Sequence, residues 1–191
     1  MPTRRLANLL NAVAVGLNDT LETAAGAHGL DLKAATALIA LLDFTPSDTV
    51  RRLSQVIGLT HSGTVRLVDR LAAAGYLRRG PGDDMRSLKV ALTSEGRTEA
   101  LRLRQGREKA VIAALAGLSR TKCDGLTRAC EAIVANLTEQ RLAIRASGGA
   151  PAGGALCRLC DFGACGRASR LCPAASTAAG HSRGRAIPAL S

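Results

Sequence analysis

The sequence predicts a mainly helical protein with a small β-wing, and three observations lead to this fold class. Apolar residues make up 47% of the chain but aromatic residues only 2%, so the core must consist of alanine, leucine, valine and isoleucine, which favours closely packed helices. Apolar residues recur at helical spacings of three and four over long stretches. One short region, residues 76–93, instead combines two strand-like runs with a turn. A chain of 191 residues has room for one domain and a small appendage.

The first predicted helix covers residues 4–26 and ends at a glycine. Its apolar residues follow one face at spacings of four, three and four: Leu6, Leu10, Val13 and Leu17. Two arginines precede this run, as in a signal peptide, but Asn8 and Asn11 interrupt it. No stretch reaches the ~18 uncharged apolar residues of a membrane span. We therefore expect a cytoplasmic protein that does not enter a membrane.

A mostly apolar second helix, which Asp31 can cap, is predicted next. Two short helices joined by a tight turn follow it, and Ser47 can cap the first of these, the third helix of the chain. A glycine-containing turn at residues 58–60 then leads into a fourth helix that begins at His61. This arrangement is typical of a helix-turn-helix motif.

A β-hairpin is predicted after the helix-turn-helix. The runs "YLRR" and "LKVALT" have strand character, and "GPGDDMRS" between them has the glycine, proline and aspartate residues of a hairpin tip. Residues 47–92 are therefore expected to form a winged helix-turn-helix lobe. Thr93 can cap a long helix to about residue 115, and a last helix covers about residues 120–145.

The last predicted helix has an apolar seam that includes two cysteines. Its members recur at spacings of three, four, three and four: Cys123, Leu126, Cys130, Ile133 and Leu137. Such a seam packs against other helices. Because a free cysteine behaves as a small apolar residue, we expect Cys123 and Cys130 to be core thiols.

The C-terminal region divides into three segments by composition. Residues 147–156 are rich in glycine and alanine and are predicted to be a flexible linker after a domain of residues 1–146. Residues 157–173 hold four cysteines. Residues 174–191 have too few large apolar side chains to pack and are predicted to be a disordered tail.

The charge balance favours a polyanion as partner. The chain has 26 basic and 15 acidic residues, and a strong basic excess is typical of nucleic-acid binding. The fourth predicted helix would be the recognition helix of the helix-turn-helix motif, and its first residues would reach base edges in the major groove of double-stranded DNA. The candidates for base contact are therefore Thr60, His61, Ser62 and Arg66. Arg66 is the best guanine reader among them. Arg70 is expected to hold a phosphate or an internal carboxylate.

The segments "LTHSGTVRLVDRLAAAGYLRR" and "DDMRSLKVALTSEG" resemble the MarR family of winged helix-turn-helix regulators. The resemblance is loose over residues 4–145 and specific between about 50 and 96. It implies a homodimeric transcriptional regulator, most simply a repressor, and not an enzyme. The dimer would interlock through residues 4–26 and 93–145. A two-fold dimer implies a pseudo-palindromic operator with half-sites ~10 base pairs apart.

The resemblance also assigns roles in the wing and suggests an effector. Asp84 and Arg86 match the D-x-R of the family, which implies that Arg86 enters the minor groove while Asp84 orients it. Many family members release DNA when a small aromatic acid binds between the dimer helices and the DNA lobe. With so few aromatic residues in this chain, the small-molecule effector stays open.

The four C-terminal cysteines have the spacing C-x2-C-x4-C-x6-C: Cys157, Cys160, Cys165 and Cys172. A segment this short cannot bury a core, and four thiolates are a full tetrahedral set for structural zinc. An iron–sulfur cluster and redox-active thiols remain alternatives. Two alternative functions follow: a thiol or iron–sulfur redox or electron-transfer protein, and a protein-binding adaptor on the same fold. We expect a metal site, and its role as a regulator of DNA binding stays open.

Overall fold

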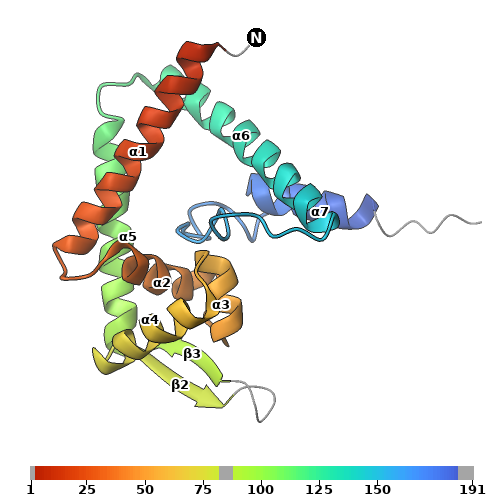
Figure 1. Cartoon of the computed structure of the whole chain (residues 1–191). Coiled ribbons are helices and arrows are strands. Elements are labelled where there is room, and N and C mark those ends of the chain that lie inside the picture. Colours follow the sequence, from red (N-terminus) through yellow and green to blue (C-terminus); the bar gives the residue numbers. More distant parts are fainter. Residues whose placement is uncertain (1–2, 82–87, 185–191) are drawn as a thin grey trace, which may run out of the picture.

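The structure is a computed structural model, and it describes residues 3–81 and 88–184. It is mainly helical with a small antiparallel sheet, as the sequence predicts (Figure 1). In chain order the elements are α1 (Arg4–Gly26), α2 (Leu32–Asp43), β1 (Ser47–Thr49), α3 (Val50–Ile57), α4 (His61–Ala73), β2 (Leu77–Pro81), β3 (Leu88–Leu92), α5 (Ser94–Ala114), α6 (Arg120–Ala146) and α7 (Pro173–Gly184).

The core is centred on α2. Its N-cap is Asp31, which accepts a hydrogen bond from the Ala34 N–H at 2.7 Å, as predicted. Every residue of α2 from Ala34 to Leu42 is buried, and α1, α3, α4 and α5 all contact the helix. Because many of these side chains are alanines, the surrounding helices approach closely without aromatic residues to fill the space.

Residues 47–92, the predicted winged helix-turn-helix lobe and hereafter the DNA lobe, contain the expected elements in the expected order, with one addition. Before α3 the chain forms the short strand β1, which pairs with β3, so that the antiparallel sheet has the order β1-β3-β2. Ser47 lies in this strand and does not cap α3. The N-cap is Thr49, whose hydroxyl accepts from the Arg52 N–H at 3.2 Å. A three-residue strand carries almost no periodic signal, which explains the error.

Three long helices, α1, α5 and α6, extend away from this lobe (Figure 1). α5 packs against both α1 and α2. The apolar seam of α6 is exposed in the single chain, with Leu126, Ile133 and Leu137 at 39%, 40% and 39%. Cys130 is also exposed and Cys123 is half-buried, so the prediction that both are core thiols is wrong for the isolated chain.

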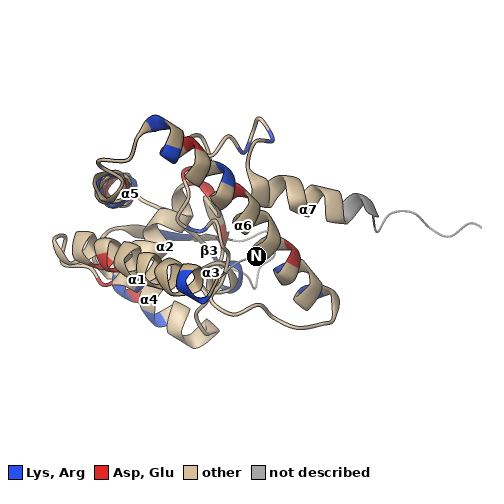
Figure 2. Cartoon of the chain, turned by 90° about the horizontal axis from the view of Figure 1, so that it is seen from above, with Lys and Arg blue, Asp and Glu red and all other residues tan. Residues whose placement is uncertain are grey.

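The end of the chain is more ordered than predicted. Pro173–Gly184 form α7, which packs against α6, so the prediction of a disordered tail from 174 onward is wrong over this helix. Proline at the first helical position favours its start, and the helix is rich in alanine, a strong helix former. Apart from its last turn, α7 shows no charged residue (Figure 2). Residues 185–191 lie outside the described part of the chain.

In residues 3–81 and 88–184, no helix combines the length and apolar character needed to cross a membrane.

Candidate nucleic-acid interface and the docked cysteine segment

The predicted recognition helix α4 begins with a well-formed cap. Thr60 accepts a hydrogen bond from the Gly63 N–H at 3.1 Å, and the buried Thr64 hydroxyl donates to the Thr60 carbonyl at 2.9 Å. Gly58, which ends α3, has a φ of 74°, a backbone conformation that glycine adopts without strain. The turn between the two helices is therefore held by glycine on one side and by a threonine cap on the other.

The face of α4 that points to solvent carries the predicted base-reading residues. Thr60, His61, Ser62 and Arg66 are all exposed, while the opposite face, with Leu67, Val68 and Leu71, is buried in the core. Arg66 forms no ion pair with any residue that the structure describes. A free guanidinium near the exposed N-terminal turns of a helix is available to a base edge or a phosphate.

Two other basic residues of the lobe are paired with carboxylates. The guanidinium of Arg70 lies 2.6 Å from the carboxylate of Asp31, the N-cap of α2. Of the two partners expected for Arg70, the structure thus shows the internal carboxylate. In β2, Arg79 pairs with Asp69 of α4, which ties the wing to the helix. Asp84 and Arg86 lie outside the described residues.

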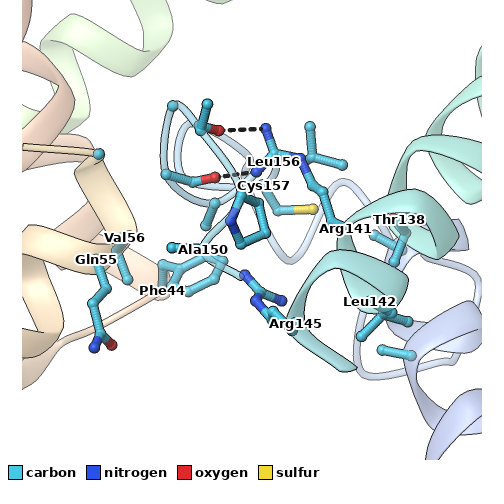
Figure 3. A pocket seen from close by; sticks show the side chains of 18 of the residues that line it. Phe44, Gln55, Val56, Thr138, Arg141, Leu142, Arg145, Ala150, Leu156 and Cys157 are labelled. Atoms are coloured by element: carbon cyan, nitrogen blue, oxygen red, sulfur yellow. Dashed lines mark hydrogen bonds between the residues drawn. The ribbon is translucent and has the colours of Figure 1, made fainter. Parts of the chain in front are cut away.

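Residues 152–172 do not form a separate appendage but lie against the DNA lobe and α6 (Figure 1). The Ala155 N–H donates to the Val56 carbonyl at 2.8 Å, near the end of α3. From α6, Arg141 donates to the carbonyls of Gly154 and Ala152, the latter at 3.0 Å (Figure 3). The last part of the predicted flexible linker is thus held between α3 and α6.

A second contact fixes the cysteine segment to α2 and α5. Arg104 of α5 lies 2.7 Å from Asp43 at the end of α2 and 3.1 Å from Asp161 of the segment. Hydrogen bonds from the Ala164 and Gly163 N–H groups and the charge of Arg104 lower the pKa of Asp161 despite some burial. This carboxylate is therefore charged at neutral pH and available to hold Arg104.

The four thiols of the segment interact in sequence order. Cys160 interacts electrostatically with Cys157 and Cys165, and Cys165 interacts in the same way with Cys172. Hydrogen bonding from Cys157 and the cations Arg107 and Arg167 lower the pKa of Cys160 to about 6, against the effect of burial.

The neighbouring thiols shift in the other direction. The hydrogen bond to Cys160 and burial raise the pKa of Cys157, and burial raises that of Cys165 to about 11. These shifts favour a thiolate at Cys160 over one at Cys157 or Cys165.

The arrangement of these thiols does not support the predicted metal site. Among the described residues no group of three or more His, Cys, Asp or Glu side chains is placed to hold a metal ion. Zinc or iron–sulfur ligation by the four cysteines stays a prediction from their spacing. What the structure shows is four free cysteines on a docked segment.

A cavity of about 880 Å³ lies between α3, α6 and the docked segment (Figure 3). Its lining includes apolar side chains such as Phe44, Val56 and Leu142 and four arginines, Arg52, Arg141, Arg145 and Arg167. No acidic residue is among its described lining residues. The cavity is thus apolar and cationic.

The sequence did not reveal the residues that dock the segment. Three of them are arginines on long helices, where a basic residue usually marks a solvated face: Arg104, Arg107 and Arg141. Two others, Asp43 and Phe44, lie at the end of a helix. The hydrogen-bond partners of Arg107 and Arg104 are 52 and 61 residues away in the sequence, so no local pattern connects them.

Comparisons with known proteins agree on the fold. Residues 28–87 match the MarR family model. Three solved structures are similar: a MarR family protein from Bacillus stearothermophilus (22% identity, TM-score 0.64, 70% of this chain and 94% of that chain), MarR from E. coli in its apo form (18%, 0.59, 70% and 97%), and a MarR family transcriptional regulator from Silicibacter pomeroyi (25%, 0.53, 67% and 86%). No curated protein matches the sequence.

MarR-family regulators are generally DNA-binding proteins and not enzymes, and the matched region contains α2, α3, α4 and β2. The docked cysteine segment lies outside the family match. The chain therefore has the winged helix-turn-helix fold of the MarR family proteins that it resembles, residues 28–87 match the model of that family, and the cysteine segment follows this fold at the C-terminal side.

Proposed function

We propose that this chain is a transcriptional repressor that binds a pseudo-palindromic operator as a homodimer. The observation that carries the proposal is the exposed face of α4, whose other face is buried. This face presents Thr60, His61, Ser62 and Arg66, and Arg66 has no ion pair among the described residues. The net charge of +11 favours association with duplex DNA. A dimer that covers two half-sites ~10 base pairs apart would block access to the DNA between them.

The exposed apolar rows support the homodimer. On α1, Leu6, Leu10 and Val13 are 46%, 44% and 54% exposed, and they recur at helical spacing like the exposed seam of α6. Contiguous apolar surface of this kind marks an interaction site. A second copy of the chain covers both rows if α1 and α6 interlock across a two-fold axis.

The cavity favours an anionic effector for the proposed regulator. Its four arginines would bind a carboxylate or phosphate, and its apolar lining would hold the rest of the molecule. Because α3 forms one wall, an occupant would contact the helix that precedes the recognition helix.

The test is duplex selection followed by binding at several salt concentrations. The regulator should select a pseudo-palindrome from genomic fragments, and its affinity should fall linearly on a log–log plot as salt rises, because bound phosphates release counterions. A chain that binds no duplex at low salt would instead fit the protein-binding adaptor. Visible absorption in anaerobically purified protein would favour the electron-transfer alternative.

A further inference from the structure

The helix α6 is connected to the rest of the described domain mainly through the docked segment, residues 152–172. Among the helices and strands of residues 3–81 and 88–184, α6 packs extensively only against α7, and Thr138 is its one buried residue. α6 follows α5 after the short connection 115–119 and diverges from it in space (Figure 1). Without the docked segment, the orientation of α6 relative to the DNA lobe would therefore depend mainly on this connection.

Both ends of the docked segment are fixed to α6. At its start, the guanidinium of Arg141 donates to the carbonyls of Gly154 and Ala152 (Figure 3), and hydrogen bonds from a charged donor are about twice as strong as neutral ones. At its end, the segment continues into α7, which begins at Pro173 and packs against α6. The segment therefore cannot leave α6 without the loss of both contacts.

The same segment is fixed to the other side, next to the recognition helix. The Ala155 N–H donates to the Val56 carbonyl at 2.8 Å, and Val56 lies two residues before Gly58, where the turn into α4 begins. Ala155 and Leu159 also pack against the hydrophobic core. The segment thus connects α6 to the end of α3, and through α3 to α4.

This connection matters for a dimer on DNA. If a partner holds the exposed seam of α6, the position of α4 relative to α6 decides how the two recognition helices lie relative to each other. One added base pair displaces the second half-site by ~3.4 Å and rotates it by ~35° about the duplex axis. A protein with a free joint between α6 and the DNA lobe would follow that change at little cost, whereas one with a fixed joint would not.

We propose that the docked segment determines which half-site spacing the protein accepts, with Arg141 as a positioning residue. The proposal rests on the proposed function as a dimeric DNA-binding regulator. The segment acts through α3 and α6 on the position of α4 and makes no contact with DNA. It also raises affinity for the matching spacing, because lobes that are already oriented lose less freedom when they bind.

Two variants release the segment at different contacts, and each has a matched control. Arg141→Gln removes the charged donor of α6. Its control is Arg128→Gln, at an exposed residue of α6 that forms no hydrogen bond or ion pair with the segment in the described part of the chain. Gly154→Ala places a methyl group against the Val56 carbonyl, whereas Gly153→Ala adds one at a similar positive φ with nothing within 4 Å.

The measurement is binding to the selected operator, to operators with base pairs inserted or deleted between the half-sites, and to a single half-site. The wild type and both controls should prefer one spacing. In Arg141→Gln and Gly154→Ala, the factor by which one inserted base pair weakens binding should fall by about fivefold or more, the low end of usual couplings between sites. Affinity for the single half-site should not change, because the face of α4 is intact.

The ratio between two spacings separates this role from a merely structural one. A domain that is only less stable would bind every duplex more weakly, and the ratio would stay the same. Hydrogen–deuterium exchange of the Ala155 N–H shows independently whether the segment is released. We expect protection in the wild type and its loss in Arg141→Gln and Gly154→Ala.

The proposal is wrong if the wild type accepts all spacings alike, or if its Ala155 N–H is unprotected. It is also wrong if a variant with a released segment keeps the spacing ratio of the wild type, or if the controls change that ratio as much as the two variants do. A wild-type protein that binds no duplex would contradict the proposed function, and this inference with it. Duplex binding with an unchanged ratio would contradict the inference alone.

Discussion

The ring of Phe44, at the end of α2, meets the ring of Phe162 in the cysteine segment edge to face, with centroids 5.7 Å apart and planes at 62°. The guanidinium of Arg167 lies above the same two rings. The C-terminal segment is thus attached to the helical domain through one of that domain's very few aromatic side chains. This contact, together with the Arg104 ion pairs, turns the extension into part of the domain's packing.

Replacing Phe162 by leucine should loosen this attachment. An aromatic pair contributes about 0.5–1.5 kcal/mol beyond its buried area, so the coupling between Phe44→Leu and Phe162→Leu in a double-mutant cycle should fall in that range. The measurement is urea unfolding of the wild type, both single variants and the double variant. A coupling energy near zero would mean that the rings pack without a specific pairing.

Replacing Arg66 by alanine should remove sequence preference from DNA binding. The side chain is exposed and forms no ion pair with a described residue, so its loss should remove a contact to DNA and leave the ion pairs of the described residues intact. We expect about 1–3 kcal/mol weaker binding to the selected operator, with a much smaller loss on random duplex. Arg128→Ala, which removes an equal charge from α6, outside the DNA lobe, should leave both affinities close to the wild type. Equal losses on operator and random duplex would instead assign Arg66 to phosphate contact.

A charge placed in the exposed seam of α6 should separate the proposed dimer. Ile133→Glu would bury a carboxylate in an apolar interface, which is costly unless the charge is paired. The variant should sediment as a single chain and bind the operator ~10³-fold or more weakly, near the level of nonspecific binding. Leu171→Glu is the matched control, because Leu171 is 73% exposed and lies outside the seam. A wild-type chain that is already monomeric would contradict the dimer itself.

Acid should weaken the lobe through Asp31. Burial alone would raise the pKa of Asp31, but the Ala34 N–H and the Arg70 guanidinium lower it below its ordinary value of 3.8. A carboxyl whose pKa is lower in the folded state stabilises the fold above its unfolded pKa, and this contribution is lost as the pH falls through the folded pKa. In Asp31→Asn, which can still cap α2, thermal stability should therefore depend less on pH between about 5 and 2 than in the wild type. Parallel curves for the two proteins would contradict this.

The helical elements could be predicted because their signals are local. Asp31 and Thr93 cap the helices that they were expected to cap, and the strands of the wing follow from two strand-like runs on either side of a turn. Ser47 was misassigned because β1 exists only through its pairing with β3. Cys123 and Cys130 were misassigned because a seam shows that a helix has a partner, and not whether the partner is in the same chain.

The end of the chain could not be predicted, because its order comes from contacts distant in sequence. Composition describes residues 147–156 as flexible, yet Gly154 lies against α3, where a Cβ would come within 2.3 Å of the Val56 carbonyl oxygen. Composition also describes residues 173–184 as too poor in large apolar residues to pack, yet they form α7, which packs against α6. The residues on the exposed face of α4 could be predicted from the sequence. The ion pair of Arg70 with Asp31 could not, because only the fold brings these two residues together.

The close approach at Gly154 provides a direct test of the docked segment. Gly154→Ala places a methyl group where the Val56 oxygen and the Gly58 nitrogen leave no space, at a residue whose φ is 77°. Gly153→Ala is a matched control, since Gly153 has a similar φ of 75° but nothing within 4 Å of an added Cβ. Both variants therefore share the backbone strain of a side chain at positive φ, and only the first also has the clash. Hydrogen–deuterium exchange should show faster exchange of the Ala155 N–H in Gly154→Ala than in Gly153→Ala, because the hydrogen bond to Val56 is lost. Equal protection in the two variants would mean that the segment reaches α3 without depending on this contact.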